Sequence, residues 1–219
     1  MRCRYELILF DLDGTLTDSS PGIFNALAKG FRSAGWPEPG PEQRRRFIGP
    51  PLYDILAELY PDMPEETAKA LVSADRSYYI ARGFAENRVF DGIPALLSDL
   101  RGAGAKLAVA TSKPIRATNL VLKKLHLAER FDLVSAADNS DHGGGKEELI
   151  LPVLRKTGVP PSRALMIGDT KYDAAGARNA GTDFVGVLYG FGTRGEMERE
   201  GAAHFAETVE ELRRFLFSI

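Results

Sequence analysis

The sequence contains very little cysteine and histidine, the residue types on which disulfides and zinc sites depend. Its 219 residues include one cysteine, Cys3, and three histidines. A single thiol cannot form an internal disulfide, which is typical of a protein in a reducing compartment. His126, His142 and His204 are widely spaced, and the sequence has no Cys/His cluster of the kind that binds zinc. The sequence therefore indicates neither a zinc centre nor a disulfide-stapled fold.

The sequence also lacks a long apolar run and an excess of charge of one sign. Lys and Arg number 28 and Asp and Glu number 30, so the formal net charge is −2. This balance favours neither a nucleic-acid partner nor a membrane surface. The one tight basic run, residues 44–46, is interpreted as a solvated helix face. The apolar run at residues 7–10 is too short for a signal peptide or a membrane span. We therefore expect a cytoplasmic protein, either a monomer or a homodimer.

Short apolar segments alternate with amphipathic segments along most of the chain. This alternation is typical of a parallel sheet with helices on both faces. The sequence therefore predicts an α/β fold with a Rossmann-like core. The predicted strands are residues 5–10, 106–111, 164–168 and 183–188, with a weaker candidate at 132–135. The predicted helices are residues 94–101, 114–125, 146–157 and 172–180.

The stretch between residues 20 and 88 differs, because it contains helical signals and no convincing strand. A helix is expected to begin at Pro21, capped by Ser20, and to close at Gly35. Shorter helices are expected at residues 42–47 and 52–59, and a longer one from Pro64 to about residue 82. We therefore predict a core domain formed by residues 1–17 and 89–219, with an all-helical cap domain, residues 18–88, inserted after the first strand.

Four carboxylates stand where the predicted strands end. Asp11 and Asp13 follow the first strand, and Asp169 and Asp173 follow the strand at residues 164–168. In an open parallel sheet, ligands bind beyond the carboxyl ends of the strands, so these side chains should converge. Carboxylates in one crevice repel each other unless a cation holds them. An all-oxygen donor set of this kind favours Mg²⁺ beside a substrate phosphate.

Hydroxyl and ammonium groups stand at neighbouring predicted ends. Thr111, Ser112 and Lys113 follow the second strand, and Pro114 is expected at the first position of the next helix. The free N–H groups of a helix N-terminus favour an anion. Lys146 follows three glycines, residues 143–145, and is expected to open another helix. Together these groups predict a receptacle for a phosphoryl group.

A nucleophile for this receptacle has to come from the carboxylates, because no Ser-His-Asp arrangement is apparent. A carboxylate such as that of Asp11 can attack phosphorus and form an aspartyl-phosphate. Asp13 could then protonate the leaving oxygen and activate the attacking water. Taken singly, each of these motifs is as well explained by a turn, a helix start or a surface charge. Their combination, each at a predicted strand or helix end, favours catalysis.

The same residues resemble the motifs of the haloacid dehalogenase superfamily, specifically its phosphatases with a helical cap after the first strand. Residues 11–15 look like the first motif, residues 111–113 like the second, Lys146 like the third and residues 168–173 like the fourth. The motifs keep the family's order across essentially the whole chain. Within the family, residues 48–52 and 187–192 are similar to phosphoglycolate phosphatases and bacterial 5′-nucleotidases.

The resemblance implies a role for each of these residues. Asp11 would be the nucleophile and a magnesium ligand. Asp13 would be the acid and base, with its backbone carbonyl on the metal. Asp169 would bind the metal directly, and Asp173 would act through water or by orienting the loop. The residues implied in holding the phosphoryl group are Thr111 and Lys146, with Lys113 beside it and Ser112 as a further donor. The substrate implied is a small phosphate ester, such as phosphoglycolate or a nucleoside monophosphate.

Other functions remain open at this point. A phosphomutase of the β-phosphoglucomutase type would use the same Asp11 and Asp13. A non-catalytic phospholigand-binding protein would have little reason to keep all four motifs. A dehalogenase would lack the second aspartate of the first motif, and a phosphonate hydrolase would need a reactive lysine in the cap. In the cap, Arg46, Gly49, Tyr53 and Tyr79 are candidates to face the substrate.

Overall fold

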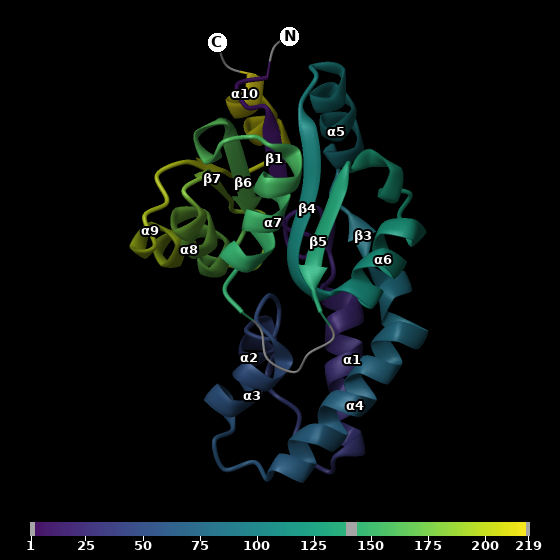
Figure 1. Cartoon of the computed structure of the whole chain (residues 1–219). Helices are drawn as coiled ribbons and strands as arrows, with labels where there is room; N and C mark the ends of the chain where they lie inside the picture. Colours follow the sequence, from purple (N-terminus) through teal and green to yellow (C-terminus); the bar gives the residue numbers. More distant parts are fainter. Residues whose placement is uncertain (1–2, 139–143, 218–219) are drawn as a thin grey trace.

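Six parallel strands form the central sheet of the computed structural model, which describes residues 3–138 and 144–217. In space the strands follow the order β5-β4-β1-β6-β7-β8 (Figure 1). Their bounds are Leu7–Phe10 for β1, Lys106–Pro114 for β4, Leu133–Ala137 for β5, Ala164–Gly168 for β6, Asp183–Val187 for β7 and Phe205–Ala206 for β8. The predicted α/β class with a parallel sheet is confirmed.

The middle strands are apolar because both of their faces are covered. Every residue of β1 and β6 is buried. Side chains of a strand alternate between the faces, so Ile8 and Phe10 pack into one hydrophobic cluster while Leu7 and Leu9 pack into the other. The helices on the first face are α5 (Ile93–Gly102), α6 (Ile115–Lys124) and α10 (Val209–Phe217). Those on the second face are α7 (Glu147–Thr157), α8 (Lys171–Ala180) and α9 (Arg194–Arg199).

The register of the sheet brings the ends of three strands together. Phe10, the last residue of β1, lies between Val109 of β4 and Ile167 of β6. Because the strands are parallel, the residues that follow these positions lie at the same edge. Asp11, Thr111 and Asp169 are therefore neighbours, as the rule for parallel sheets predicts.

A helical insertion lies between β1 and β4 and extends away from the sheet (Figure 1). It is entered and left through a two-stranded antiparallel pair, β2 (Thr17–Asp18) and β3 (Arg88–Val89). Its helices are α1 (Ser20–Ser33), α2 (Pro41–Arg45), α3 (Leu52–Leu59) and α4 (Glu65–Ala81). The helices α1, α3 and α4 share an apolar cluster that includes Phe31, Leu56 and Leu71. The division into domains of residues 1–17 with 89–219 and residues 18–88 stays a prediction.

The helices α1 and α4 pack closely because a glycine faces the contact. A Cβ atom on Gly30 of α1 would lie 2.9 Å from the backbone oxygen of Leu71 and 3.3 Å from Cβ of Asp75. Any larger residue at this position would push the two helices apart. Gly30 therefore sets the separation of the two long helices, and with it the position of the side chains on α4.

Two local expectations were wrong in detail. The cap of α1 is Ser19, not Ser20; Ser20 is the first helical residue, and its N–H and hydroxyl both donate to Asp18 Oδ1, at 3.0 and 2.6 Å. Pro114 is the N-cap of α6 rather than its first helical residue, since its ψ of 139° is extended. The strand β4 therefore continues through Ser112 and Lys113.

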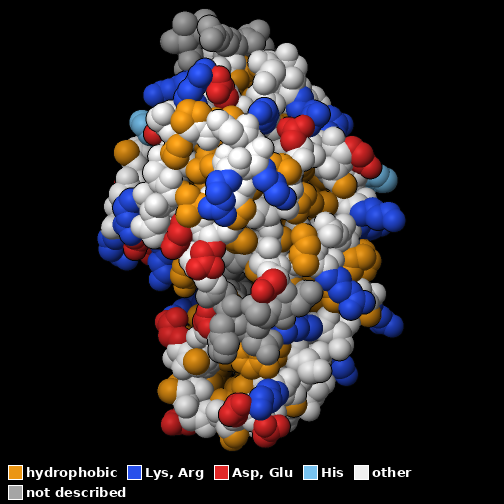
Figure 2. Space-filling model, viewed as in Figure 1, with side chains coloured by type: hydrophobic (Ala, Val, Ile, Leu, Met, Phe, Trp, Pro, Cys, Tyr) orange, Lys and Arg blue, Asp and Glu red, His pale blue; other side chains and the backbone are white. Residues whose placement is uncertain are grey.

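The remaining elements are short. They are three 3₁₀ turns, Gly83–Glu86, Ala128–Arg130 and Pro161–Arg163. On the face shown in Figure 2, Lys and Arg side chains lie interspersed with Asp and Glu over both parts of the molecule. Among residues 3–138 and 144–217, no helix has both the length and the apolar character needed to cross a membrane.

Candidate active site

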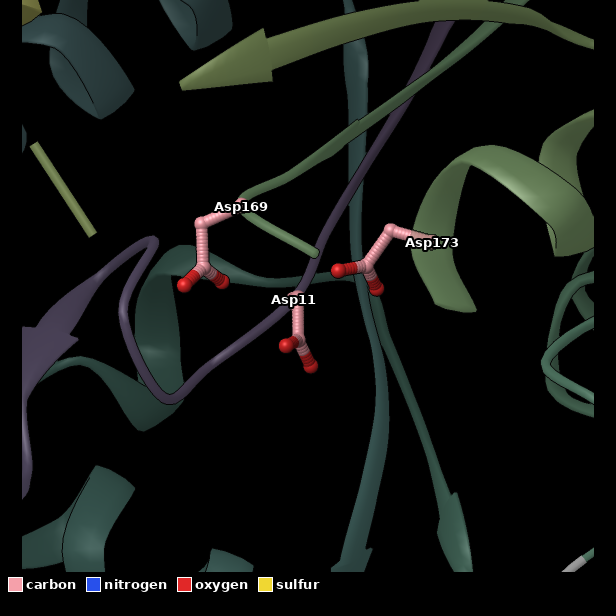
Figure 3. A group of neighbouring side chains, drawn as sticks. All are labelled: Asp11, Asp169 and Asp173. Atoms are coloured by element: carbon pink, nitrogen blue, oxygen red, sulfur yellow. The ribbon is translucent and has the colours of Figure 1, made fainter. Parts of the chain in front are cut away.

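Three buried carboxylates converge at the edge of the sheet where β1 and β6 end. Asp11 follows β1, Asp169 follows β6, and Asp173 lies in the first turn of α8. Each offers one oxygen, and these oxygens all lie within 4.8 Å of one another. Figure 3 shows the three side chains turned toward a shared space. The sequence predicted this convergence, and the structure brings the three residues together.

Lys146 lies between two of these carboxylates. Its Nζ is 2.8 Å from Asp11 Oδ1 and 2.7 Å from Asp173 Oδ1. The residue is the N-cap of α7, and α8 approaches it closely at Gly176, where a Cβ atom would lie 2.4 Å from Cβ of Lys146. His142 and Gly143, which precede it in the chain, lie outside the described residues. Lys146 is thus fixed beside Asp11 by two ion pairs and by close helix packing.

Burial and charge shift the pKa values of this group in opposite directions. Burial raises the pKa of Asp11 to about 6, although Lys146 beside it acts to lower it. Burial, helped by the charges of Asp173 and Asp11, raises the pKa of Asp169 well above its usual range. Burial alone would lower the pKa of Lys146, but Asp11 and Asp173 outweigh it and hold that pKa above its usual value. The negative charge of the three carboxylates therefore exceeds the positive charge that Lys146 supplies beside them.

Asp169 is held by contacts on both of its carboxylate oxygens. The hydroxyl of Thr15 donates to Oδ1 at 3.2 Å, and the N–H of Phe191 donates to Oδ2 at 2.8 Å. Gly14 has a φ of +80°, and a Cβ atom there would lie 2.2 Å from Asp169 Oδ2. Thr15 and Phe191 lie in the segments 11–15 and 187–192 that the sequence singled out, but no role was predicted for either. Their hydrogen bonds orient the Asp169 carboxylate.

Asp173 is both a member of the carboxylate group and a helix cap. Its Oδ2 accepts hydrogen bonds from the N–H of Thr170 at 3.0 Å and from the Thr170 hydroxyl at 2.7 Å. This is one half of a capping box at the start of α8. Because Oδ2 is occupied in this way, Oδ1 remains directed at Lys146. The side chain thereby connects the start of α8 to the lysine.

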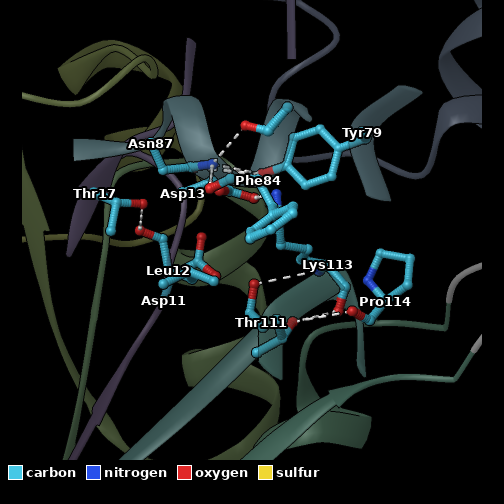
Figure 4. Close-up of polar contacts among 12 residues, drawn as sticks. Asp11, Leu12, Asp13, Thr17, Tyr79, Phe84, Asn87, Thr111, Lys113 and Pro114 are labelled. Atoms are coloured by element: carbon cyan, nitrogen blue, oxygen red, sulfur yellow. Dashed lines mark hydrogen bonds and ion pairs between the residues drawn. The ribbon is translucent and has the colours of Figure 1, made fainter. Parts of the chain in front are cut away.

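A second charged pair, Asp13 with Lys113, lies beside the first group. Lys113 Nζ is 2.7 Å from Asp13 Oδ2 and 4.4 Å from the centre of the Tyr79 ring (Figure 4). Burial alone would lower the pKa of Lys113, but Asp13 and Tyr79 outweigh it and raise it. Asp13 Oδ1 is buried and has no hydrogen-bond partner in the described part of the chain. Asp13 therefore presents one free oxygen to the site.

Thr111 and Ser112 complete the set of predicted residues. Thr111 is buried, and its Oγ1 accepts a hydrogen bond from the N–H of Lys113 at 3.3 Å. Ser112 lies next to it on β4 and lines the adjoining cavity. Both residues thus lie at the same edge of the sheet as Asp11 and Asp13. The structure brings all the predicted core residues to one place.

A cavity of about 480 Å³ lies between this edge of the sheet and the helical insertion. Asp13, Ser112 and Lys113 line it from the core, and Gly49 and Tyr79 line it from the insertion. Tyr79 is anchored by Asn87, whose Nδ2 donates to the tyrosine oxygen at 2.9 Å. Of the four cap candidates, Gly49 and Tyr79 therefore face the cavity. Arg46 instead pairs with Glu58, and Tyr53 packs beside Arg76.

The donor set fits a hard divalent cation. Asp11, Asp169 and Asp173 supply only carboxylate oxygens, and Lys146 is the one cation in ion-pair contact with them among the described residues. The three negative charges therefore exceed the positive charge beside them. Oxygen donors with excess negative charge are what Mg²⁺ prefers, and the group contains neither sulfur nor imidazole.

Comparison with known proteins shows a family match and close structural relatives. A family described as haloacid dehalogenase-like hydrolase matches residues 8–187. The chain is 37% identical over 215 residues to a 5′-nucleotidase of Pseudomonas aeruginosa, covering 98% of this chain and 97% of the relative. It is 35% identical over 213 residues to the tyrosine-protein kinase PtkA of Mycobacterium tuberculosis, covering 96% of this chain and 72% of the relative.

Among solved structures, the crystal structure of a predicted phosphatase from Clostridium acetobutylicum superposes with a TM-score of 0.90 at 36% identity. That comparison covers 98% of this chain and 99% of the other. The similarity therefore includes the sheet, the helical insertion and the edge at which the carboxylates meet.

Proposed function

The chain belongs to the haloacid dehalogenase-like hydrolase family, and we propose that it is a Mg²⁺-dependent phosphatase that acts through an aspartyl-phosphate on Asp11. The motifs of the sequence predicted this family, and the comparisons confirm it. The observation that supports the proposed chemistry is the meeting of Asp11, Asp169, Asp173 and Lys146 at one edge of the sheet.

The reaction has two steps, both at phosphorus. In the first, a carboxylate oxygen of Asp11 forms a bond to phosphorus while the bond to the leaving oxygen breaks, and Asp13 donates a proton to that oxygen. In the second, Asp13 takes a proton from water, whose oxygen attacks phosphorus. The bond between Asp11 and phosphorus then breaks, and inorganic phosphate leaves. Asp13 Oδ1, which is buried and has no hydrogen-bond partner among the described residues, is the oxygen that would make both proton transfers.

The rest of the site positions the phosphoryl group and balances its charge. Thr111 and Lys146 hold its oxygens, with Ser112 and Lys113 at the side toward the cavity. Asp11, Asp169 and the backbone carbonyl of Asp13 would hold Mg²⁺, and Asp173 would act through water or by orienting the loop. When bound, Mg²⁺ supplies charge neutralisation at the phosphoryl oxygens.

The substrate in this proposal is a small phosphorylated metabolite, with phosphoglycolate and nucleoside monophosphates as the leading candidates. The leaving group would occupy the cavity of about 480 Å³ next to Asp13 and Lys113. This volume lies within the ordinary range of small-molecule sites. The cavity is formed partly by the insertion, so residues of the insertion set the substrate preference.

Phosphate release from 4-nitrophenyl phosphate tests the proposal. We expect release with Mg²⁺, none with EDTA, and recovery when Mg²⁺ is restored. Asp11→Asn should retain the fold but reduce release to background. Asp91→Asn, at an exposed acidic residue on the core, is the matched control and should behave like wild type. Full activity in EDTA, or appreciable turnover by Asp11→Asn, would contradict the proposal.

A second candidate function follows from the similarity to PtkA, at 35% identity. A protein kinase would transfer the γ-phosphoryl group of ATP to a tyrosine hydroxyl of a partner. Incubation with ATP, Mg²⁺ and a tyrosine-containing protein, followed by phosphotyrosine detection, distinguishes it. Phosphotyrosine without hydrolysis of small esters would favour the kinase. Isomerised sugar phosphate would favour a phosphomutase, and tight binding without turnover a phospholigand-binding protein.

A further inference from the structure

Two carboxyl groups that line the cavity, Asp75 and Asp138, lie outside the machinery described so far. Asp75 is on α4 and lines the same cavity as Asp13 and Lys113. It precedes Tyr79 by four residues, so the two side chains lie on the same face of the helix, one turn apart. No described residue donates a hydrogen bond to the Asp75 carboxyl group or forms an ion pair with it. Asp75 is therefore an acceptor that no contact within the described chain satisfies.

The surroundings of Asp75 make an ionised carboxyl costly for the fold. Burial raises its pKa to about 7, although the charges of Lys113 and Arg76 act to lower it. The helix α1 closes one side, because Gly30 allows it to come close to Asp75. A half-buried carboxyl group without donors on the protein is left to be satisfied by water or by a ligand in the cavity. Asp75 is therefore placed to accept hydrogen bonds from a ligand bound there.

Three cations also line the cavity: Lys113, Arg76 and Arg116. Lys113 is paired with Asp13, the Arg76 guanidinium lies 5.9 Å from the centre of the Tyr53 ring, and Arg116 is exposed to solvent. An acidic group of a ligand placed beside Asp75 itself would meet a like charge. A group with hydroxyl or amino hydrogens would meet an acceptor.

The remaining walls of the cavity are largely apolar. They include side chains from α1, from the loop before α3 and from α4. These are Ile23, Leu27, Phe47, Pro51 and Ile80. The cavity volume of about 480 Å³ is larger than the two-carbon leaving group of phosphoglycolate would fill, and that leaving group has no apolar face to place against these walls. They suit a leaving group with an apolar face and hydrogen-bond donors, and a nucleoside has both.

We propose that Asp75 is a specificity-determining residue that accepts hydrogen bonds from the leaving group and selects nucleoside monophosphates over esters with a carboxylate, such as phosphoglycolate. The inference rests on the proposed phosphatase function and assigns its substrate class. The nucleoside lies with its base against the apolar wall, and a ribose hydroxyl or base amino group donates to Asp75. A carboxylate in the same place would be repelled.

The experiment compares wild type with Asp75→Asn on three substrates: inosine 5′-monophosphate, 2-phosphoglycolate and 4-nitrophenyl phosphate. At pH 8.5, above the pKa of about 7 of Asp75, we expect kcat/KM for the nucleotide, relative to 4-nitrophenyl phosphate, to fall about tenfold. The fall should come mainly through KM, because a hydrogen bond to a carboxylate is replaced by a weaker one to a neutral amide oxygen. The same ratio for phosphoglycolate should rise. The matched control is Asp62→Asn, at an exposed acidic residue of the insertion outside the cavity, and it should leave both ratios unchanged. Unchanged ratios in Asp75→Asn, with activity present, would overturn the role of Asp75.

A binding measurement separates this inference from the proposed function. If wild type hydrolyses none of the three substrates, the phosphatase proposal fails, and the Asp75 contact is then judged by equilibrium binding of the nucleoside inosine. Binding that weakens about tenfold in Asp75→Asn but not in Asp62→Asn supports the contact. The Asp75 contact is overturned if inosine binds Asp75→Asn and Asp62→Asn with equal affinity, or if it does not bind wild type.

Discussion

Replacement of Lys146 by methionine tests the charge balance of the site directly. Lys146 has a side chain that is only 3% exposed, and its Nζ contacts Asp11 and Asp173 at 2.8 and 2.7 Å. Methionine fills a similar volume but leaves the two carboxylates without their cation. Removing one partner of a buried ion pair usually costs about 3–5 kcal/mol, because the remaining charge is uncompensated. We expect the free energy of unfolding to fall by this amount at pH 8 in the absence of Mg²⁺.

The loss should depend on pH with a definite sign. Burial already raises the pKa of Asp11 to about 6 in the presence of Lys146, and removing the lysine raises it further. A carboxyl group with a raised pKa binds more protons in the native state than in the unfolded state, so stability falls as pH rises through that window. The raised pKa of Asp11 alone corresponds to roughly 3 kcal/mol between pH 4 and pH 6. In Lys146→Met the window extends to higher pH, so the deficit relative to wild type grows with pH.

Urea unfolding at pH 5, 6.5 and 8, without added metal, measures this effect. Lys124→Met is the matched control, since it removes the same charge from an exposed position on α6. We expect the control to stay within about 0.5 kcal/mol of wild type at each pH. The electrostatic reasoning would be refuted if the free energy of unfolding of Lys146→Met were close to that of wild type at pH 8, or if the difference between the two became smaller as pH rises. Added Mg²⁺ should recover part of the loss, because it binds only the folded site.

Two further predictions concern groups next to Asp11. Asp13→Asn should let the aspartyl-phosphate form slowly and accumulate, since the base for its hydrolysis is missing; single-turnover measurements that show normal phosphoenzyme breakdown would count against this. Gly14→Ala should lower the free energy of unfolding by more than the roughly 1 kcal/mol typical of placing a Cβ at positive φ, because that Cβ would lie 2.2 Å from Asp169 Oδ2. It should also reduce activity, because Asp169 would have to move. Gly35→Ala, at a φ of +65° with nothing within 4 Å of the new Cβ, is the control and should keep full activity.

The fold could be predicted from the sequence wherever burial imposes a simple pattern. The segment that became β6 is apolar throughout because both of its faces are covered, and its predicted bounds of 164–168 match the structure. The two-residue strands β2 and β3 were missed because they are too short for any period to be visible. The end of β4 was missed because Pro114 is compatible with the first helical position as well as with the extended conformation that it adopts.

The site could be predicted to the extent that it follows from strand ends. Asp11 and Asp169 follow neighbouring parallel strands, so their convergence requires only the order of the strands. The contacts of Thr15 and Phe191 with Asp169 could not be predicted, because they depend on how two loops fold against each other. Asp75 could not be recognised for the same reason. Its place in the cavity depends on the approach of α1 to α4, which Gly30 sets.

The charges of the assembled site explain why a cation should be needed before a phosphate can bind. Asp11 and Asp173 are paired with Lys146, and Asp13 is paired with Lys113, so both lysines are already neutralised by carboxylates. With Asp169 added, and all groups ionised, carboxylates outnumber ammonium groups. A phosphate dianion entering such a site would be repelled, although two lysines stand beside it. A divalent cation held by Asp11 and Asp169 would release Lys146 to interact with the phosphoryl oxygens, whereas Lys113 would stay paired with the Asp13 side chain. In the proposed mechanism the ion pairs hold both lysines in position, and the metal would determine when the charge of Lys146 becomes available to a substrate.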